Sequence, residues 1–258
     1  GNAKVIARTG IGYDQVDVAA ATERGIAVCN TPAAPTASTA EHAVALLLAA
    51  AKRGPSSARR LIEGQADLYS AHRARELDGK TLGLVGFGRI ARRVARAAEG
   101  LGMVAIAYDP FLPADAFSVE RVTDLDELLG RSDAVSVHVP LTTDTRRLFD
   151  SGRFAAMKPG AVFVNTARGG VVDQEALLEA LESGHLFAAG IDVTELGGCE
   201  GCVGERWRAD AVRAVWAGSG IEVDGRRTAG VRLRSGVPIR MNGREYTPFQ
   251  IALGGDTA

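Results

Sequence analysis

The sequence predicts an α/β fold built around a doubly wound parallel sheet. Two observations lead to this prediction. Apolar segments typical of buried strands alternate with helical segments between residues 80 and 193, a pattern typical of parallel sheets with helices on both faces. One of these strands also runs directly into a glycine-rich turn and a helix, at residues 86–91. Because ligands of such sheets bind beyond the carboxyl ends of the strands, residues at those ends form the candidate site.

Hydrophobic periodicity and breaks define the elements of the N-terminal part. A strand over residues 4–8, a helix over 17–24 and a strand over 26–29 form a short unit that begins in mid-pattern, which suggests that earlier strands are missing. A helix follows over residues 36–53, with Ser38, Thr39 and Glu41 as start signals. Its apolar residues nearly encircle it, so we expect it to be buried between domains or subunits. A further helix is predicted over residues 55–65.

The central part of the chain alternates regularly between the two kinds of element. We expect strands over residues 80–85, 103–108, 134–139, 161–165 and 188–193, and helices over 89–99, 124–130, 151–157 and 174–182. Beyond residue 196 the pattern changes. The dipeptides Asp224-Gly225 and Asn242-Gly243 predict two β-hairpins there, so the tail is expected to be irregular or β-hairpin structure.

Composition limits the partners and the location. The net charge of −1, without a basic stripe, argues against nucleic acid or an anionic membrane. The longest apolar run, residues 43–51, is too short to span a bilayer, and no secretory signal opens the chain. Three cysteines make no disulfide framework, so a cytoplasmic location is expected. Cys199 and Cys202 could ligate zinc, cycle as a dithiol or lie in a flexible loop; no second pair completes a site, and no metal is predicted.

The glycine turn has the spacing of a dinucleotide-binding motif. Gly86 would make the tight turn, Gly88 would let the backbone approach a pyrophosphate, and the first helical amides, at Arg89 and Ile90, would face the phosphates. Asp109 ends the next strand, about twenty residues further on, where an acid can accept hydrogen bonds from ribose hydroxyls. An acid there favours NAD over NADP, because it repels a 2′-phosphate. The alternative is a surface aspartate at a strand end.

Candidate site residues also follow the later strands. They are His138, Val139, Pro140 and Thr142, then Thr166, Ala167 and Arg168, and finally Asp192. Arg168 could fork onto a substrate carboxylate and polarise a carbonyl, or it could be a surface arginine at a strand end. Asp192 could accept a hydrogen bond from a nicotinamide carboxamide, or be a satisfied turn aspartate. We expect His138 to be a packed or nucleotide-side residue rather than a proton carrier, and His42 to be structural or solvated.

The loop after the first strand offers a second anion site. Gly10 and Gly12 would expose backbone N–H groups that can bind a carboxylate, although an ordinary strand-to-helix turn would look the same. Together with the strand ends, this loop resembles the NAD-dependent D-isomer-specific 2-hydroxyacid dehydrogenases, particularly their phosphoglycerate dehydrogenase branch. The resemblance runs over about residues 3–195 and rests on these segments: Arg8-Thr9-Gly10-Ile11-Gly12-Tyr13-Asp14, Ala40-Glu41-His42, the glycine turn, Val137-His138-Val139-Pro140-Leu141-Thr142, Asn165-Thr166-Ala167-Arg168-Gly169-Gly170 and Gly190-Ile191-Asp192-Val193.

The resemblance implies a partial flavodoxin-like substrate domain over residues 1–32, a Rossmann-type NAD-binding domain over 33–195 and a divergent tail over 196–258. It implies hydride transfer between NAD(H) and a small 2-hydroxy or 2-oxo acid, in a homodimer formed through the NAD-binding domain. In the family, the arginine that corresponds to Arg168 binds the substrate's carboxylate and carbonyl. The loop that corresponds to Arg8, Thr9, Gly10, Ile11 and Gly12 holds the carboxylate, and the glycine-turn and strand-end residues lie on the cofactor side.

The chain departs from the family pattern at the proton-transfer residues. The family's glutamate lies five positions beyond the strand-end aspartate, where this chain has Gly197, and Glu195 is only three beyond Asp192. The family's histidine lies in a downstream Thr-Pro-His segment, but no histidine follows His185. Three hypotheses stay open: a dehydrogenase with impaired activity, a corepressor-like NAD(H)-binding relative without turnover, and a truncated or rearranged gene product.

Overall fold

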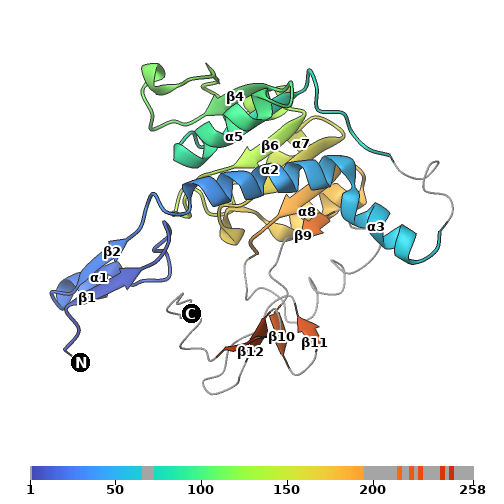
Figure 1. The fold of residues 1–258 in the computed structure, drawn as a ribbon. Coiled ribbons are helices and arrows are strands. Elements are labelled where there is room, and N and C mark those ends of the chain that lie inside the picture. Colours follow the sequence, from blue (N-terminus) through green and yellow to red (C-terminus); the bar gives the residue numbers. More distant parts are fainter. Residues whose placement is uncertain are drawn as a thin grey trace.

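A seven-stranded sheet forms the centre of the molecule (Figure 1). The computed structural model describes residues 2–65 and 73–194, together with five short strands between residues 214 and 246. The strand order is β5-β4-β3-β6-β7-β8-β9, and every pairing is parallel. The strands are β3 (Thr81–Val85), β4 (Val104–Tyr108), β5 (Glu120–Arg121), β6 (Ala134–Val137), β7 (Ala161–Asn165), β8 (Leu186–Ile191) and β9 (Ala214–Trp216). The predicted parallel α/β sheet is confirmed.

The path of the chain places a topological switch point beside β3. From β3 the chain moves outward to β4 and β5, and then returns to β6 on the opposite side of β3. The carboxyl ends of β3 and β6 therefore flank the crevice in which open α/β sheets bind their ligands.

Helices cover both faces of this sheet. They are α2 (Thr36–Lys52), α5 (Arg89–Glu99), α6 (Leu125–Arg131), α7 (Ser151–Ala156) and α8 (Gln174–Glu182). Helix α3 (Gly54–Ile62) continues from the end of α2, and the 3-10 turns are η1 (Ala114–Ala116) and η2 (Gly169–Val171). Three of them begin at an aspartate whose carboxylate accepts a first-turn N–H: Asp124 for α6, Asp150 for α7 and Asp173 for α8. Such caps satisfy amides that would otherwise lack partners, which is why these helices begin where they do.

Two hydrophobic clusters fill the spaces between the sheet and its helices. Alternate side chains of β7 lie on opposite faces of the sheet and so belong to different clusters. Val162 and Val164 pack with α2 and α5, whereas Phe163 packs with α6, α7 and α8. This division follows from the two-residue period of a strand that is buried on both sides. In Figure 1, α2 lies along one face of the sheet beside α5.

The N-terminal residues form a small unit of their own (Figure 1). Strands β1 (Val5–Arg8) and β2 (Ala27–Asn30) pair in parallel and are joined through α1 (Val18–Glu23), which Asp17 caps. The predicted strand, helix and strand are confirmed, with bounds shifted by one residue. The unit places the loop at residues 9–14 against the end of the main sheet.

The described strands of the tail belong to two sheets. β10 (Ile221–Val223) pairs with β11 (Arg226–Thr228), and β12 (Ile239–Met241) pairs with β13 (Arg244–Tyr246), both antiparallel, which confirms the two predicted hairpins. β10 also pairs with β12, so the hairpins form one four-stranded sheet. β9, for which the sequence carries no strand pattern, adds to the main sheet in parallel with β8.

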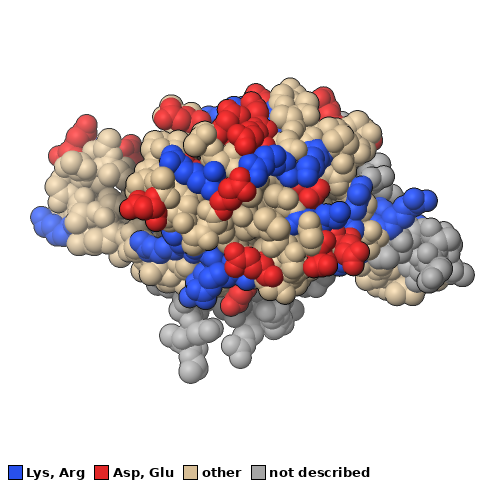
Figure 2. Space-filling model, turned by 90° about the horizontal axis from the view of Figure 1, so that it is seen from above, with Lys and Arg blue, Asp and Glu red and all other residues tan. Residues whose placement is uncertain are grey.

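Surface charge is mixed. Basic and acidic side chains are interspersed over the face shown in Figure 2, which fits the net charge of −1 and presents no continuous basic stripe to a nucleic acid backbone on that face. None of the helices that the structure describes is both long enough and apolar enough to cross a membrane.

Candidate active site

The glycine turn joins β3 to α5 at the switch point. Gly86 has a φ of 86°, a left-handed conformation that favours glycine, and its N–H donates to the Tyr108 carbonyl at 2.8 Å. A Cβ at this position would lie 2.9 Å from the carbonyl oxygen of His138. Gly88 is the N-cap of α5 and supplies no side-chain cap, and a Cβ there would meet nothing within 4 Å. The first turn of α5 is therefore open to an external anion.

Asp109 is tied to this turn by its carboxylate. Its Oδ2 accepts the Phe87 N–H at 2.9 Å, and its Oδ1 accepts the Phe111 N–H at 3.0 Å. The Phe87 ring stacks on Phe117, with 5.2 Å between centroids, and the Arg92 guanidinium lies 4.7 Å from the centroid of the Phe87 ring. These contacts fix the carboxylate beside the turn, and each oxygen keeps a second lone pair for a hydroxyl donor.

His138 follows β6 and packs beneath the turn. Its N–H donates to the Val85 carbonyl at 2.8 Å, and its Nε2 lies 2.9 Å from the Ser136 Oγ. Burial lowers the pKa of His138 to about 4. The imidazole is therefore neutral at pH 7, and its position supports the expectation of a packed, nucleotide-side residue.

This depressed pKa predicts an acid-dependent loss of stability. Between pH 6.5 and pH 4 the unfolded chain binds a proton on this histidine that the folded chain excludes, so stability falls as the pH drops through that window. We expect the free energy of unfolding to fall by about 2 kcal/mol between pH 7 and pH 5 from this residue alone. His138→Gln removes this contribution, so urea unfolding at pH 7, 6 and 5 should show a shallower pH slope. Equal slopes in the variant and the parent would contradict the assignment.

Arg168, in the turn that follows β7, contacts the loop of the N-terminal unit. Its Nε donates to Asp14 Oδ1 at 2.9 Å and its Nη1 donates to the Ala167 carbonyl at 2.6 Å. A Cβ on Gly12 would lie 1.3 Å from Nη2 of Arg168, so the guanidinium rests directly on the glycine loop. The structure therefore brings together two segments predicted to bind one carboxylate.

The loop itself is anchored at the end of β2. Its backbone at Gly10 accepts the Thr31 N–H at 3.1 Å and donates to the Thr31 Oγ1 at 2.7 Å, while the Asn30 Nδ2 donates to the Ile11 carbonyl at 2.8 Å. The expectation that the Gly10 N–H is exposed for a carboxylate is wrong, because this N–H donates to the Thr31 hydroxyl. Arg8, at the start of the loop, has a buried Nε for which the structure provides no hydrogen-bond partner. This leaves a cationic donor at the site that an anion could satisfy.

The ends of β7 and β8 lie side by side. The Asp192 N–H donates to the Asn165 carbonyl at 3.0 Å, which sets Asp192 next to Thr166. The Thr166 hydroxyl is buried and has no partner in the structure. His42 of α2 reaches the same place, with its Nε2 3.3 Å from Asp192 Oδ1. His42, expected to be structural or solvated, therefore lies beside the predicted site residue Asp192.

The remaining predicted residues line or flank the crevice. Val139 Cγ1 lies 2.9 Å from where a Cβ on Gly86 would be. Pro140 and Thr142 belong to an exposed loop, in which the Thr145 Oγ1 donates to the Pro140 carbonyl at 2.6 Å and accepts the Thr142 N–H at 2.8 Å. Gly197 and Glu195, and the Cys199–Cys202 pair, lie outside the described residues. Within the described part of the chain, no three His, Cys, Asp or Glu residues are grouped as metal ligands would be.

Comparison with known protein families shows which family has this sequence. Residues 44–197 match the model of the D-isomer specific 2-hydroxyacid dehydrogenase, NAD binding domain. The chain belongs to the D-isomer specific 2-hydroxyacid dehydrogenase family. The match covers the glycine turn, Asp109, Arg168 and Asp192, and the predicted resemblance is confirmed.

Curated relatives match a longer part of the chain than the family model does. A hydroxypyruvate reductase of Thermotoga maritima is 49% identical over 195 residues, which are 76% of this chain and 63% of that protein. A D-3-phosphoglycerate dehydrogenase of Archaeoglobus fulgidus is 46% identical over 197 residues, 75% of this chain and 37% of that protein. The chain thus spans less than two thirds of either relative.

Solved structures of 2-hydroxyacid dehydrogenases share the fold. The apo form of Rhodotorula graminis D-mandelate dehydrogenase superposes with a TM-score of 0.74 at 40% identity, covering 83% of this chain and 64% of that one. An Aquifex aeolicus D-lactate dehydrogenase complexed with NAD and lactic acid gives a TM-score of 0.73 at 34% identity, covering 82% and 68%.

The described residues fit the NAD that this family binds. The open first turn of α5 and the space at Gly88 suit a pyrophosphate, and the Asp109 carboxylate suits ribose hydroxyls. The buried Thr166 hydroxyl without a partner is a polar group that a ligand at the strand ends would satisfy. The cofactor predicted from the sequence is thus supported by the family match and by the chemistry of the site.

Proposed function

We propose that this chain is an NAD-dependent oxidoreductase that moves a hydride between NAD(H) and a small 2-hydroxy or 2-oxo acid, in the manner of phosphoglycerate dehydrogenases. The observation that carries the proposal is the contact of Arg168 with the Gly12 loop. Its Nη2 atom occupies the space that a Cβ on Gly12 would fill, at the same edge of the sheet as the glycine turn. The Arg168 guanidinium and the glycine loop then lie together, where a substrate carboxylate can bind.

Each residue has a separate role in this proposal. Gly86, Gly88 and the first turn of α5 hold the pyrophosphate, Asp109 accepts from the ribose, and Asp192 accepts from the carboxamide. Bound NAD supplies or accepts the hydride. Arg168 binds the substrate carboxylate and polarises the C2 carbonyl, which stabilises negative charge that develops on its oxygen. The neutral His138 packs on the nucleotide side and takes no part in proton transfer.

We further propose that turnover is slow. Family members move the proton with a histidine that a glutamate orients, and this chain has Gly197 at the glutamate position and no histidine after His185. Loss of a positioned acid-base group lowers rates by about 10²- to 10⁴-fold. The same observation favours a second candidate function, an NAD(H)-binding protein without turnover.

Two measurements separate these functions. Titration with NADH, followed by its fluorescence, is expected to saturate in the parent protein. Asp109→Ala should weaken binding by about tenfold, because charge-assisted hydrogen bonds are lost. The matched control Asp115→Ala, in the exposed η1 turn, should leave binding unchanged. Absence of saturable binding would exclude both functions.

The second measurement is NADH oxidation with hydroxypyruvate, 3-phosphohydroxypyruvate and pyruvate. A slow rate that Arg168→Ala abolishes supports the enzyme. NADH binding without any arginine-dependent rate supports the binding protein, and a rate typical of efficient enzymes would contradict the proposed impairment.

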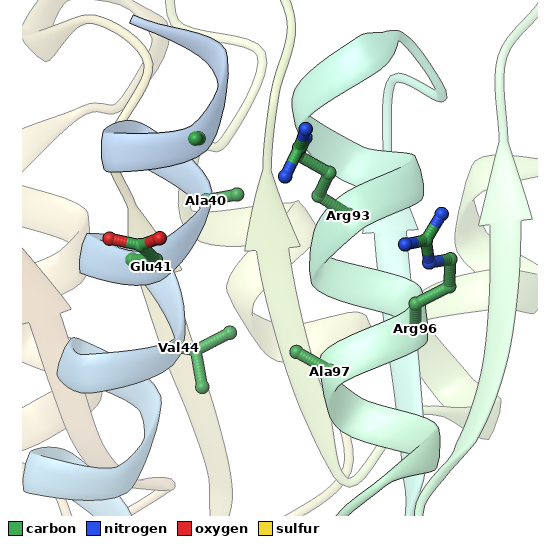
Figure 3. A pocket seen from close by; sticks show the side chains of 7 residues that line it. Ala40, Glu41, Val44, Arg93, Arg96 and Ala97 are labelled. Atoms are coloured by element: carbon green, nitrogen blue, oxygen red, sulfur yellow. The ribbon is translucent and has the colours of Figure 1, made fainter.

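We also propose that the NAD-binding domain forms a homodimer through α2 and α5. A groove of about 460 Å³ lies between these helices, with small side chains on its floor, including Ala40 and Ala97. Glu41 stands on the α2 side, and Arg93 and Arg96 on the α5 side (Figure 3). A patch that carries both charge signs is self-complementary across a two-fold axis, which an isologous interface requires.

Charge reversal tests this interface. Arg96→Glu is expected to weaken dimerisation by about tenfold in sedimentation equilibrium, because like charges then meet across the two-fold axis. The double variant Glu41→Arg with Arg96→Glu should restore it. A parent protein that is monomeric at micromolar concentration, or a dimer indifferent to Arg96→Glu, would contradict the proposal.

The other expectations stand as proposals: a substrate-domain portion over residues 1–32, an NAD-binding domain over 33–195 and a divergent tail over 196–258. A cytoplasmic location is proposed from the three cysteines, which make no disulfide framework.

A further inference from the structure

Asp14 occupies one side of the Arg168 guanidinium, and no role for it follows from the proposed chemistry alone. We infer that Asp14 is a positioning residue, which holds Arg168 so that its Nη2 faces the carboxylate site at the Gly12 loop. The inference rests on the proposed function, since it concerns the binding of substrate by the same arginine.

The geometry of the guanidinium supports this role. A guanidinium has three nitrogens in one plane, so fixing two of them fixes the direction of the third. Nε of Arg168 donates to Asp14 Oδ1 at 2.9 Å, and Nη1 donates to the Ala167 carbonyl at 2.6 Å. The remaining nitrogen, Nη2, lies 1.3 Å from where a Cβ on Gly12 would be. Any side chain at position 12 would collide with this nitrogen, so only glycine fits there.

Asp14 is itself held firmly enough to orient its partner. The loop that carries it is bonded to Thr31 at Gly10 and to Asn30 at Ile11. Burial raises the pKa of Asp14, but the hydrogen bond from Arg168 and the charges of Arg168 and Arg8 outweigh it, so the pKa lies below its usual value. The carboxylate is therefore ionised at neutral pH and makes a charge-assisted bond.

The opposite role would be competition. The Asp14 carboxylate bonds to the same guanidinium that would bind the substrate carboxylate, so Asp14 could instead exclude the substrate. The two roles predict opposite changes in substrate affinity when Asp14 is removed. If Asp14 positions Arg168, its removal weakens substrate binding; if Asp14 competes with the substrate, its removal tightens substrate binding. Asp14 bonds to Nε of Arg168, and Nη2 lies at the glycine loop, so the geometry favours the positioning role.

Oxamate, a 2-oxo acid analogue, measures this sign without turnover. With saturating NADH, oxamate is titrated by fluorescence into the parent, Asp14→Ala, Asp14→Asn and Asp17→Ala. Asp14→Ala should weaken oxamate binding by about tenfold, since an unheld guanidinium loses its alignment, and Asp14→Asn, which keeps an acceptor oxygen, should stay within about threefold. Asp17→Ala, which removes the cap of α1 in the same unit, should not change it. Oxamate binding to Asp14→Ala that equals or exceeds the parent's would overturn the inference.

A second measurement needs no NADH. The Nε–H resonance of Arg168, assigned by its loss in Arg168→Lys, should exchange slowly with water in the parent and in Asp14→Asn, and should be lost in Asp14→Ala. If NADH does not bind, the proposed function is wrong. The Nε–H resonance still tests, independently of NADH, whether Asp14 holds Arg168 in place. Its persistence in Asp14→Ala would refute the role of Asp14.

Discussion

Gly86→Val is expected to abolish NADH binding in the measurable range, weakening it by about 100-fold or more. Two physical effects combine. A β-branched residue at a φ of 86° is strained by its own backbone. Its Cβ would also lie 2.9 Å from the carbonyl oxygen of His138 and from Val139 Cγ1, so the turn must shift away from β6. Displacements of about 1 Å in a binding turn can cost about 100-fold in function.

The control for this variant must carry the same backbone strain elsewhere. Gly184 has a φ of 76°, and a Cβ there would meet nothing within 4 Å. Gly184→Val should therefore lower the melting temperature while leaving the NADH dissociation constant unchanged. If both variants bind NADH like the parent, the left-handed turn at Gly86 is not required for nucleotide binding.

Phe163→Ala is expected to lower the free energy of unfolding by about 4 kcal/mol. Phe163 is fully buried at the centre of the cluster beneath α7 and α8. Its ring centroid lies 4.9 Å from that of Phe149 and 5.2 Å from that of Phe154, so its removal opens a cavity and breaks two aromatic contacts. Because whole domains are stable by only about 5–15 kcal/mol, urea denaturation should reveal this change clearly.

A matched substitution on the surface separates burial from residue type. Phe111 is 85% exposed, so Phe111→Ala removes the same atoms without creating a cavity. We expect a change in stability below about 0.5 kcal/mol for this variant. Similar losses in the two variants would contradict the assignment of Phe163 to the core.

Local pattern was sufficient to predict the main elements. α5, β7 and α8 have the predicted bounds, and most other elements of the main sheet and its helices differ by one or two residues. Long apolar strands and aspartate caps are local signals, and they determine these elements. β5 and β9 were missed because strands of two and three residues carry no period of their own, and only pairing with a neighbouring strand makes them strands.

The site could be predicted in part for the same reason. Strand ends and glycine spacing located the turn, Asp109 and Arg168. The partners of Arg168 and Asp192 could not be predicted, because both partners are far away along the chain. Asp14 is 154 residues from Arg168, and His42 lies in α2, long before Asp192 at the end of β8. Asp14 and His42 both stand in the segments that carry the family resemblance, and only folding shows which groups they meet.

The short strand β5 also determines how the molecule can associate. A sheet edge offers unpaired amides and carbonyls to any passing strand. At β5 this edge is only Glu120 and Arg121, both exposed, and Arg131 Nη2 lies 2.6 Å from Glu120 Oε1. A foreign strand would have to pair with two charged residues over a length too short to hold it. Aggregation by strand addition is therefore disfavoured on this side of the sheet.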